Sequence, residues 1–125
     1  MKILFIGCGG FVGALLRYAI THFTKLSTNH HFPIATLIAN GLGCLMAGML
    51  LTYLKTRTHL SPELVAGLSV GFLGALTTFS AFSVETLHLM ENYHFFWPLF
   101  NIVSNIVLGF CALYLGRYLM GLVLV

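Results

Sequence analysis

Residues 71–85 read GFLGALTTFSAFSVE, and this stretch decides the fold of the third apolar segment of the chain. Glycines, threonines, serines and one glutamate interrupt a segment that runs over about residues 62–90, which is longer than the roughly 20 residues a spanning helix needs. Non-helical backbone at membrane depth is tolerated only where protein, ion or water satisfies the released carbonyl groups. The sequence therefore predicts a membrane helix that breaks near Gly74 to Thr78.

The composition of the whole chain agrees with a membrane protein. The 125 residues are 58% hydrophobic and only 7% charged, with a mean hydropathy of +0.95, so they cannot build the polar shell of a soluble domain. We expect the lipid bilayer to form that shell around a single domain that covers residues 1–125. The net charge of +3 is small and scattered, so no nucleic-acid partner is expected.

Four apolar segments are long enough to span a bilayer, and short polar connections join them. The predicted fold is an all-α membrane protein with four transmembrane helices, of which the third is broken. Ser61, Pro62 and Glu63 read as a helix cap, a first-turn proline and a favourable early carboxylate. The four segments cover about residues 3–24, 33–54, 62–90 and 96–118.

Four spans place both termini on one side of the membrane, and the charges on the two sides differ little. Lys25 and Arg17 lie on the side opposite the termini, and four basic residues lie on the side of the termini. Because this difference is small, the positive-inside rule determines the orientation only weakly. Four short helices also enclose little volume, and we expect at least a dimer. The four basic residues on the side of the termini are Lys2, Lys55, Arg57 and Arg117.

Small residues mark where helices can approach closely, and polar residues mark the resumed third helix. Phe79 and Phe82 are three residues apart and share a helical face, while Ser80 and Ser83 lie on an adjacent one. Backbone carbonyl groups at the break would suit an alkali or alkaline-earth cation. Close approach is expected at Gly9, Gly13, Gly67, Gly71 and Gly74.

Four motifs together resemble the Fluc (CrcB) family of fluoride channels. They are GCGGFVGALLRY at 7–18, TLIANGLG at 36–43, the stretch at 71–85, and the spacing of Asn101, Asn105 and Gly109 in the last helix. The resemblance covers almost the whole chain. It implies a passive fluoride channel of the cell inner membrane, with no enzymatic activity, that lets fluoride leave the cytoplasm and so reduces its toxicity.

The resemblance also implies an assembly and an ion. The family forms a homodimer whose subunits insert in opposite orientations, which gives two antiparallel pores. A central sodium ion, structural and not transported, is held by main-chain carbonyls that correspond here to those of Gly74 and Thr77. The nearly balanced charges of the connections agree with such a dual topology.

The pore residues follow by the same resemblance. Phe79 and Phe82 match phenylalanines whose ring edges face fluoride, and an aromatic edge is electropositive. Asn40 and Thr36, four residues apart on one face, can donate hydrogen bonds to the anion. The remaining pore residues would be Ser83, Asn101 and Asn105, although relatives often have tyrosine and serine at the two asparagine positions.

Four further residues are expected to organise the structure rather than to touch fluoride. A carboxylate would repel the anion, so Glu85 would orient the resumed helix, and Arg17 would anchor the first helix near an interface. Thr78 and Ser80 lie in the motif beside the break. The histidines show no metal-ligand spacing, and the single cysteines Cys8, Cys44 and Cys111 read as packing residues.

Two alternatives to a fluoride channel stay open at this point. The first is a dual-topology exporter that exchanges protons for an organic cation at a buried glutamate, although the first helix has no carboxylate. The second is a structural or assembly subunit without a transport path, which the polar stripe in the last helix and the broken third helix disfavour.

Overall fold

The computed structural model describes residues 1–27, 32–56 and 60–124, and the regular elements in these ranges are all helices. Four stretches are long and apolar enough to span a membrane, so the prediction of four transmembrane helices is confirmed. Arg57, one of the charges compared between the two sides, lies outside the described residues. The elements are α1 (Lys2–Ser27), α2 (Ile34–Thr56), α3 (Pro62–Ala66), the π-helix η1 (Gly67–Leu73), α4 (Gly74–Leu76), α5 (Phe79–Asn92) and α6 (Phe96–Leu124).

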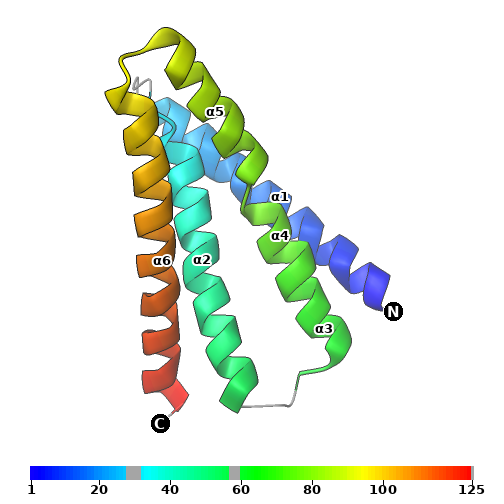
Figure 1. Ribbon diagram of the computed structural model, residues 1–125. Helices are drawn as coiled ribbons and strands as arrows, with labels where there is room; N and C mark the ends of the chain where they lie inside the picture. The colour runs from blue at the N-terminus through cyan, green and yellow to red at the C-terminus, as the bar shows by residue number, and fades with distance from the viewer. Residues whose placement is uncertain (28–31, 57–59, 125) are drawn as a thin grey trace.

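The helices form two close pairs that meet along the third span. In Figure 1, α2 and α6 run side by side, while α1 crosses behind the column made by α3, η1 and α4. The start of α1, the end of α2 and the start of α3 lie together, because Lys2, Leu54 and Pro62 line one groove. The last span extends to Leu124, six residues beyond the predicted boundary at 118.

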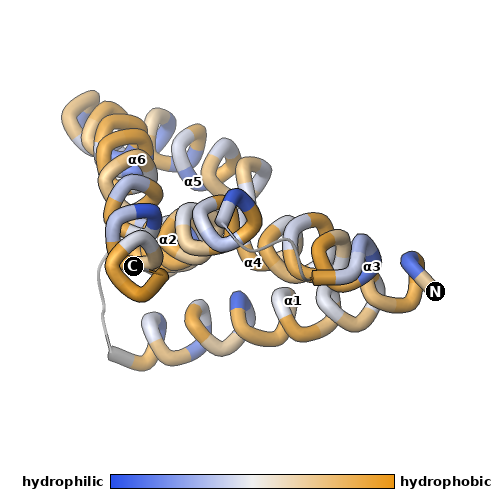
Figure 2. The backbone as a smooth tube through the Cα atoms, turned by 90° about the horizontal axis from the view of Figure 1, so that it is seen from below, coloured by the Kyte–Doolittle hydropathy of each residue, from blue (hydrophilic) through white to orange (hydrophobic). Residues whose placement is uncertain are grey.

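Apolar side chains cover the outside of this bundle. Hydrophobic stretches run along every helix in Figure 2, and residues such as Phe11, Val70 and Phe110 are more than 60% exposed. The large, fully buried side chains in the described chain are few, namely Leu76, Leu89, Pro98 and Asn101. An apolar surface of this extent is stable only in lipid, so the chain is a multi-pass membrane protein.

The contact between α1 and the third span is made by glycines. A Cβ atom on Gly9 would overlap the Gly67 carbonyl oxygen, and one on Gly71 would overlap the Ile6 carbonyl oxygen. A Cβ atom on Gly13 would likewise overlap the Phe72 carbonyl oxygen, and one on Gly67 would lie 2.9 Å from the Phe5 carbonyl oxygen. The prediction of close approach is confirmed at these four positions. Within the single chain no such approach is present at Gly74, which is exposed and whose added Cβ would meet only the Ser69 carbonyl oxygen of its own span, at 3.9 Å; close approach there stays a prediction.

The contact between α2 and α6 is also made by glycines, at positions that we did not predict. A Cβ atom on Gly48 would overlap the Leu113 carbonyl oxygen, and one on Gly116 would overlap the Leu45 carbonyl oxygen. Without a hydrophobic force between helices in lipid, close backbone packing of this kind is a main source of helix association. Both helix pairs are therefore tightly joined.

The third span changes its backbone geometry several times. Ser61 accepts a hydrogen bond from the Leu64 amide at 3.3 Å and precedes Pro62, which confirms the predicted cap. The span then continues as a π-helix over Gly67–Leu73, a form that is rare and often found at functional sites. Residues Thr77 and Thr78 separate α4 from α5 with extended backbone angles (φ −81°, ψ 151° and φ −151°, ψ 118°). We call these two residues the linker.

Candidate functional site

The linker is held by an asparagine of a neighbouring helix. In an uninterrupted α-helix the Thr78 amide would donate to the Gly74 carbonyl, but here it donates to Asn40 Oδ1 on α2 at 2.9 Å. The Thr78 hydroxyl accepts a bond from the Ala81 amide at 3.2 Å and so caps α5. The Asn40 side chain therefore replaces a main-chain partner at the point where the helix is interrupted.

A groove of about 350 Å³ opens beside this linker. It brings together six residues that were predicted from the sequence as site residues, although they come from the second helix, the third span and the last helix. We call it the phenylalanine groove. Its lining residues are Asn40, Cys44, Thr77, Thr78, Phe79, Phe82, Asn105 and Ile106.

The two phenylalanines lie against each other at the start of α5. Their ring centroids are 5.6 Å apart and their planes are inclined by 44°. Phe82 is partly buried, whereas Phe79 is 80% exposed and projects from the chain. The predicted shared face is thus present, and one of the two rings has most of its surface available for further contacts.

Polar side chains behind the groove form a continuous network. Asn40 Nδ2 donates to Asn105 Oδ1 at 3.2 Å, and Asn105 Nδ2 donates to Asn101 Oδ1 at 3.1 Å. Asn101 Nδ2 in turn donates to the Thr86 hydroxyl at 2.8 Å. We call Thr86, Asn101, Asn105, Asn40 and the Thr78 amide the polar network. It connects α5, α6, α2 and the linker in one series of hydrogen bonds.

The two asparagines of the last helix occupy different environments. Asn105 lines the phenylalanine groove, while Asn101 is completely buried at 0% exposure. Thr86, only 6% exposed, is its partner and was not selected from the sequence. Its position four residues after Phe82, one turn farther along the same helix, was the available signal.

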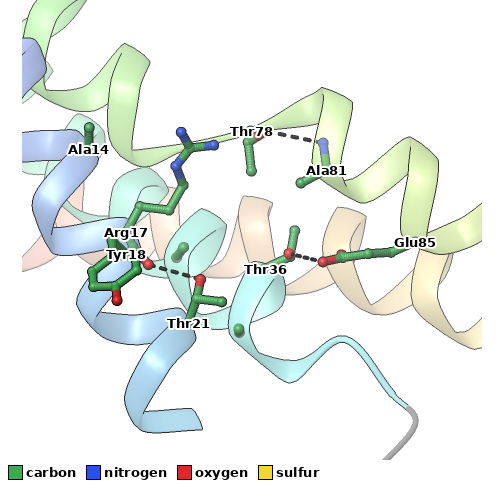
Figure 3. Close-up of a pocket in the computed structure, with 10 residues that line it drawn as sticks. Ala14, Arg17, Tyr18, Thr21, Thr36, Thr78, Ala81 and Glu85 are labelled. Atoms are coloured by element: carbon green, nitrogen blue, oxygen red, sulfur yellow. Dashed lines mark hydrogen bonds between the residues drawn. The ribbon is translucent and has the colours of Figure 1, made fainter. Parts of the chain in front are cut away.

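A second cavity, of about 300 Å³, also includes Thr78 of the linker in its lining and is shown in Figure 3. Arg17 of α1, Thr36 of α2 and Glu85 of α5 all line it. The Thr36 hydroxyl donates to Glu85 Oε1 at 2.7 Å, while Glu85 Oε2 is buried with no hydrogen-bond partner among the described residues. Thr36 shares the α2 face of Asn40, as predicted, but its hydroxyl is directed to the glutamate.

Of the remaining predicted residues, Ser80, Ser83 and Gly74 line neither of these two cavities. The Ser83 hydroxyl donates to the Phe79 carbonyl at 2.9 Å, and the Ser80 hydroxyl lies 3.2 Å from that of Thr78. Gly74 and Thr77 line a further groove of about 410 Å³ beside the phenylalanine groove. Within the described ranges, no group of three His, Cys, Asp or Glu side chains is placed to hold a metal ion.

Cys44 belongs to the site although the sequence indicated only packing. It lies one turn after Asn40 on α2 and lines both the phenylalanine groove and the groove that contains Gly74. Thr77 is the other residue that the two grooves share. The spacing of four residues from Asn40 could have placed the thiol on this face.

Four apolar spans, the third of which contains a two-residue extended linker beside amide groups and two phenylalanines, define a small polytopic membrane protein with a polar site among its helices. Residues 4–117 match the family described as "CrcB-like protein, Camphor Resistance (CrcB)", and the chain belongs to that family.

Relatives of known name agree with this assignment. A protein of Moorella thermoacetica named "Fluoride-specific ion channel FluC 1" is 41% identical over 95% of this chain and 85% of its own length. "Fluoride-specific ion channel FluC" of Shewanella denitrificans is 42% identical over 94% of both chains. A protein of the same name from Dehalococcoides mccartyi is 39% identical over 94% of this chain and 91% of its own.

Proposed function

We propose that the protein is a fluoride channel that lets the anion leave the cytoplasm down its electrochemical gradient. The observation that carries this proposal is the phenylalanine groove, in which an asparagine amide and two aromatic rings meet beside the linker. The names of the relatives support the same function. Hydrogen fluoride enters cells as the neutral acid and ionises inside, so a passive pore is sufficient to remove the anion.

The chemistry of the groove suits a small anion. Amide hydrogens can replace the water of a dehydrated fluoride ion, and the electropositive edges of Phe79 and Phe82 can face it. The lining residues include no carboxylate, whose charge would repel the ion. Glu85 lies in the other cavity, where its Oε1 is bonded to Thr36.

We propose that the working unit is an antiparallel, dual-topology homodimer. One chain leaves Phe79 80% exposed next to the groove and leaves Gly74 exposed beside the linker. A second copy could cover both surfaces and complete a closed path with its own rings. Because the charges of the two sides are nearly balanced, either orientation in the membrane is accessible.

Added charge at one loop tests the dual topology. Two lysines inserted within residues 25–31 should force a single orientation, so that the variant expressed alone passes little fluoride. Co-expression with a partner forced into the opposite orientation should restore the flux. Full activity of the single fixed-orientation variant would exclude the antiparallel dimer.

We further propose that the linker lies at membrane depth and that a structural sodium ion binds there. The Thr78 amide is directed to Asn40 and therefore does not bond the Gly74 carbonyl. Neutral carbonyl oxygens of Gly74 and Thr77 from two subunits are suitable ligands for a monovalent hard cation. Replacement of sodium by a bulky organic cation should abolish the flux slowly. Uphill fluoride transport driven by a sodium gradient would instead identify a symporter.

The central experiment is fluoride efflux from liposomes that contain only this protein, with chloride as the control anion. A channel should release fluoride rapidly and chloride hardly at all. Absence of fluoride release would favour an assembly subunit, and proton-coupled uptake of an organic cation would identify an exporter. The exporter is disfavoured by Arg17, because this cation lines the same cavity as Glu85.

A further inference from the structure

Thr86 stands at the buried end of the polar network, away from the groove. Its hydroxyl donates to the Phe82 carbonyl at 2.7 Å, so the single hydroxyl hydrogen is already used. The oxygen can then act only as an acceptor, and Asn101 Nδ2 donates to it at 2.8 Å. Thr86 therefore determines which end of the Asn101 amide faces α5.

The orientation of the Asn101 amide in turn determines the orientation of the Asn105 amide. With its nitrogen toward Thr86, Asn101 presents Oδ1 to Asn105, whose Nδ2 donates to that oxygen at 3.1 Å and to the Asn101 carbonyl at 3.0 Å. The Asn105 amide nitrogen is thus directed away from Asn40. Its oxygen faces Asn40 and accepts a bond from Asn40 Nδ2 at 3.2 Å.

The other end of the network is determined by the backbone. The Thr78 amide can only donate, so it holds Asn40 Oδ1 toward itself, and Asn40 Nδ2 is directed to Asn105 Oδ1 and to the Thr78 carbonyl. The two bonds of Asn40 Nδ2, to Asn105 Oδ1 at 3.2 Å and to the Thr78 carbonyl at 3.4 Å, are the longest in the network. Long hydrogen bonds are weak, so these are the ones that an anion can most readily replace.

We propose that Thr86 and Asn101 are positioning residues that, through Asn105, keep the Asn40 amide nitrogen available to an anion in the phenylalanine groove. This inference rests on the proposed fluoride channel. It assigns Asn105 as an acceptor that orients Asn40, and not as a donor to fluoride. Thr86 acts without touching the ion, because it is 6% exposed and does not line the groove.

The test replaces Thr86 by valine, which keeps the shape but removes the hydroxyl, and by serine, which keeps the hydroxyl. Fluoride flux is measured against fluoride concentration. We expect Thr86→Val to raise the half-saturating concentration about three- to tenfold, because the buried Asn101 amide loses its acceptor and the network loosens. Thr86→Ser should stay within about twofold of the parent.

A matched control distinguishes positioning from general damage. Thr52 of α2 makes the same kind of bond to the carbonyl four residues earlier, at 3.1 Å to Gly48, but lies outside the groove. Thr52→Val should leave the half-saturating concentration unchanged. A merely structural role of Thr86 would reduce the number of active channels, and hence the maximal flux, without moving that concentration. Such a result, or equal effects of valine and serine at position 86, would overturn the proposal.

The orientation of the amides is measured separately on the parent protein. In nuclear Overhauser spectra, the side-chain amide protons of Asn101 should contact Thr86, and those of Asn105 should give stronger contacts to Asn101 than to Asn40. The reverse pattern would overturn the proposal even if Thr86→Val did not assemble. A parent protein with these contacts but no fluoride flux would refute the proposed channel and leave the network in place.

Discussion

The two halves of the third span are held in the protein by opposite means. Residues 62–76 pack against α1 through Gly67 and Gly71, whose backbones almost touch those of the neighbouring helix. Residues 79–92 instead depend on polar side chains, with Glu85 bonded to Thr36 and Thr86 bonded to Asn101. The linker divides one mode of attachment from the other.

The difference between backbone packing and side-chain hydrogen bonds indicates where an ion can enter the structure. Backbone packing between glycines leaves no room and offers no exchangeable partner, so the first half is suited to be a fixed scaffold. Hydrogen bonds can be exchanged with a permeating anion, because an amide that donates to a side chain can donate to fluoride instead. The residues of the phenylalanine groove accordingly belong to the linker and the second half, together with α2 and α6.

The largest expected effect comes from filling a glycine contact of the first half. Gly71→Leu should prevent folding or assembly, with a loss of more than about 3 kcal/mol, because the obstacle is the Ile6 backbone and not a movable side chain. Yield and size-exclusion profile in detergent measure this. Gly7→Leu is the control, since a Cβ at that position would meet no atom of another helix within 4 Å. Normal assembly of Gly71→Leu would show that the close approach is not required.

A phenylalanine of the groove should matter for flux and not for folding. Phe82→Ile keeps bulk but removes the electropositive ring edge, and we expect about a tenfold loss of fluoride flux with the dimer intact. Phe79→Ile should act in the same direction. Phe110→Ile, on the exposed surface of α6, is the control. Undiminished flux in both groove variants would remove the rings from the mechanism.

The bond between Thr36 and Glu85 should contribute to stability. Thr36→Val removes the hydrogen-bond donor to Glu85 Oε1, in a carboxyl group whose Oε2 has no partner among the described residues, and we expect a loss of about 1–3 kcal/mol in the free energy of unfolding. Thr36→Ser, which keeps the hydroxyl, should lose much less. Denaturation in mixed micelles compares the two variants. Equal stabilities would mean that the bond contributes nothing to attaching the second half.

The smallest effect is expected at Gly74, three residues beyond Gly71. An added Cβ would meet only the Ser69 carbonyl oxygen at 3.9 Å, so Gly74→Ala should change the stability of the chain by no more than about 1 kcal/mol. Thermal unfolding and size exclusion test this. A variant that folds but no longer forms the dimer would show that the partner subunit packs closely at Gly74, which would sharpen the contrast with Gly71.

Several parts of the site could be predicted because their spacing is local. The shared face of Phe79 and Phe82 and the common face of Thr36 and Asn40 follow from helical periodicity. The partners across helices could not be predicted in the same way. Nothing in the spacing indicates that Thr36 bonds to Glu85 or that Asn101 bonds to Thr86, because the helices that carry them are brought together only by packing.

The glycines illustrate the same limit within the fold. Glycine spacing correctly predicted the close approach at Gly9, Gly13, Gly67 and Gly71. The same reasoning missed the contact of Gly48 with α6, and at Gly74 no close approach is present within the single chain. The π-helix at Gly67–Leu73 was also not predicted. Its hydrogen bonds join residues five apart instead of four, and this change leaves little trace in the amino-acid composition.

The sequence by itself determined the class of protein, the four spans, the cap at Ser61 and the family, because hydropathy and local motifs act over neighbouring residues. Only the tertiary structure decided which polar atoms meet. Asn40 accepts a hydrogen bond from the Thr78 amide of the linker, the buried Asn101 accepts one from Asn105, and Thr36 donates one to Glu85. The physical reason is that a buried hydrogen bond depends on the position and direction of two groups on different helices, and both depend on how closely the backbones pack.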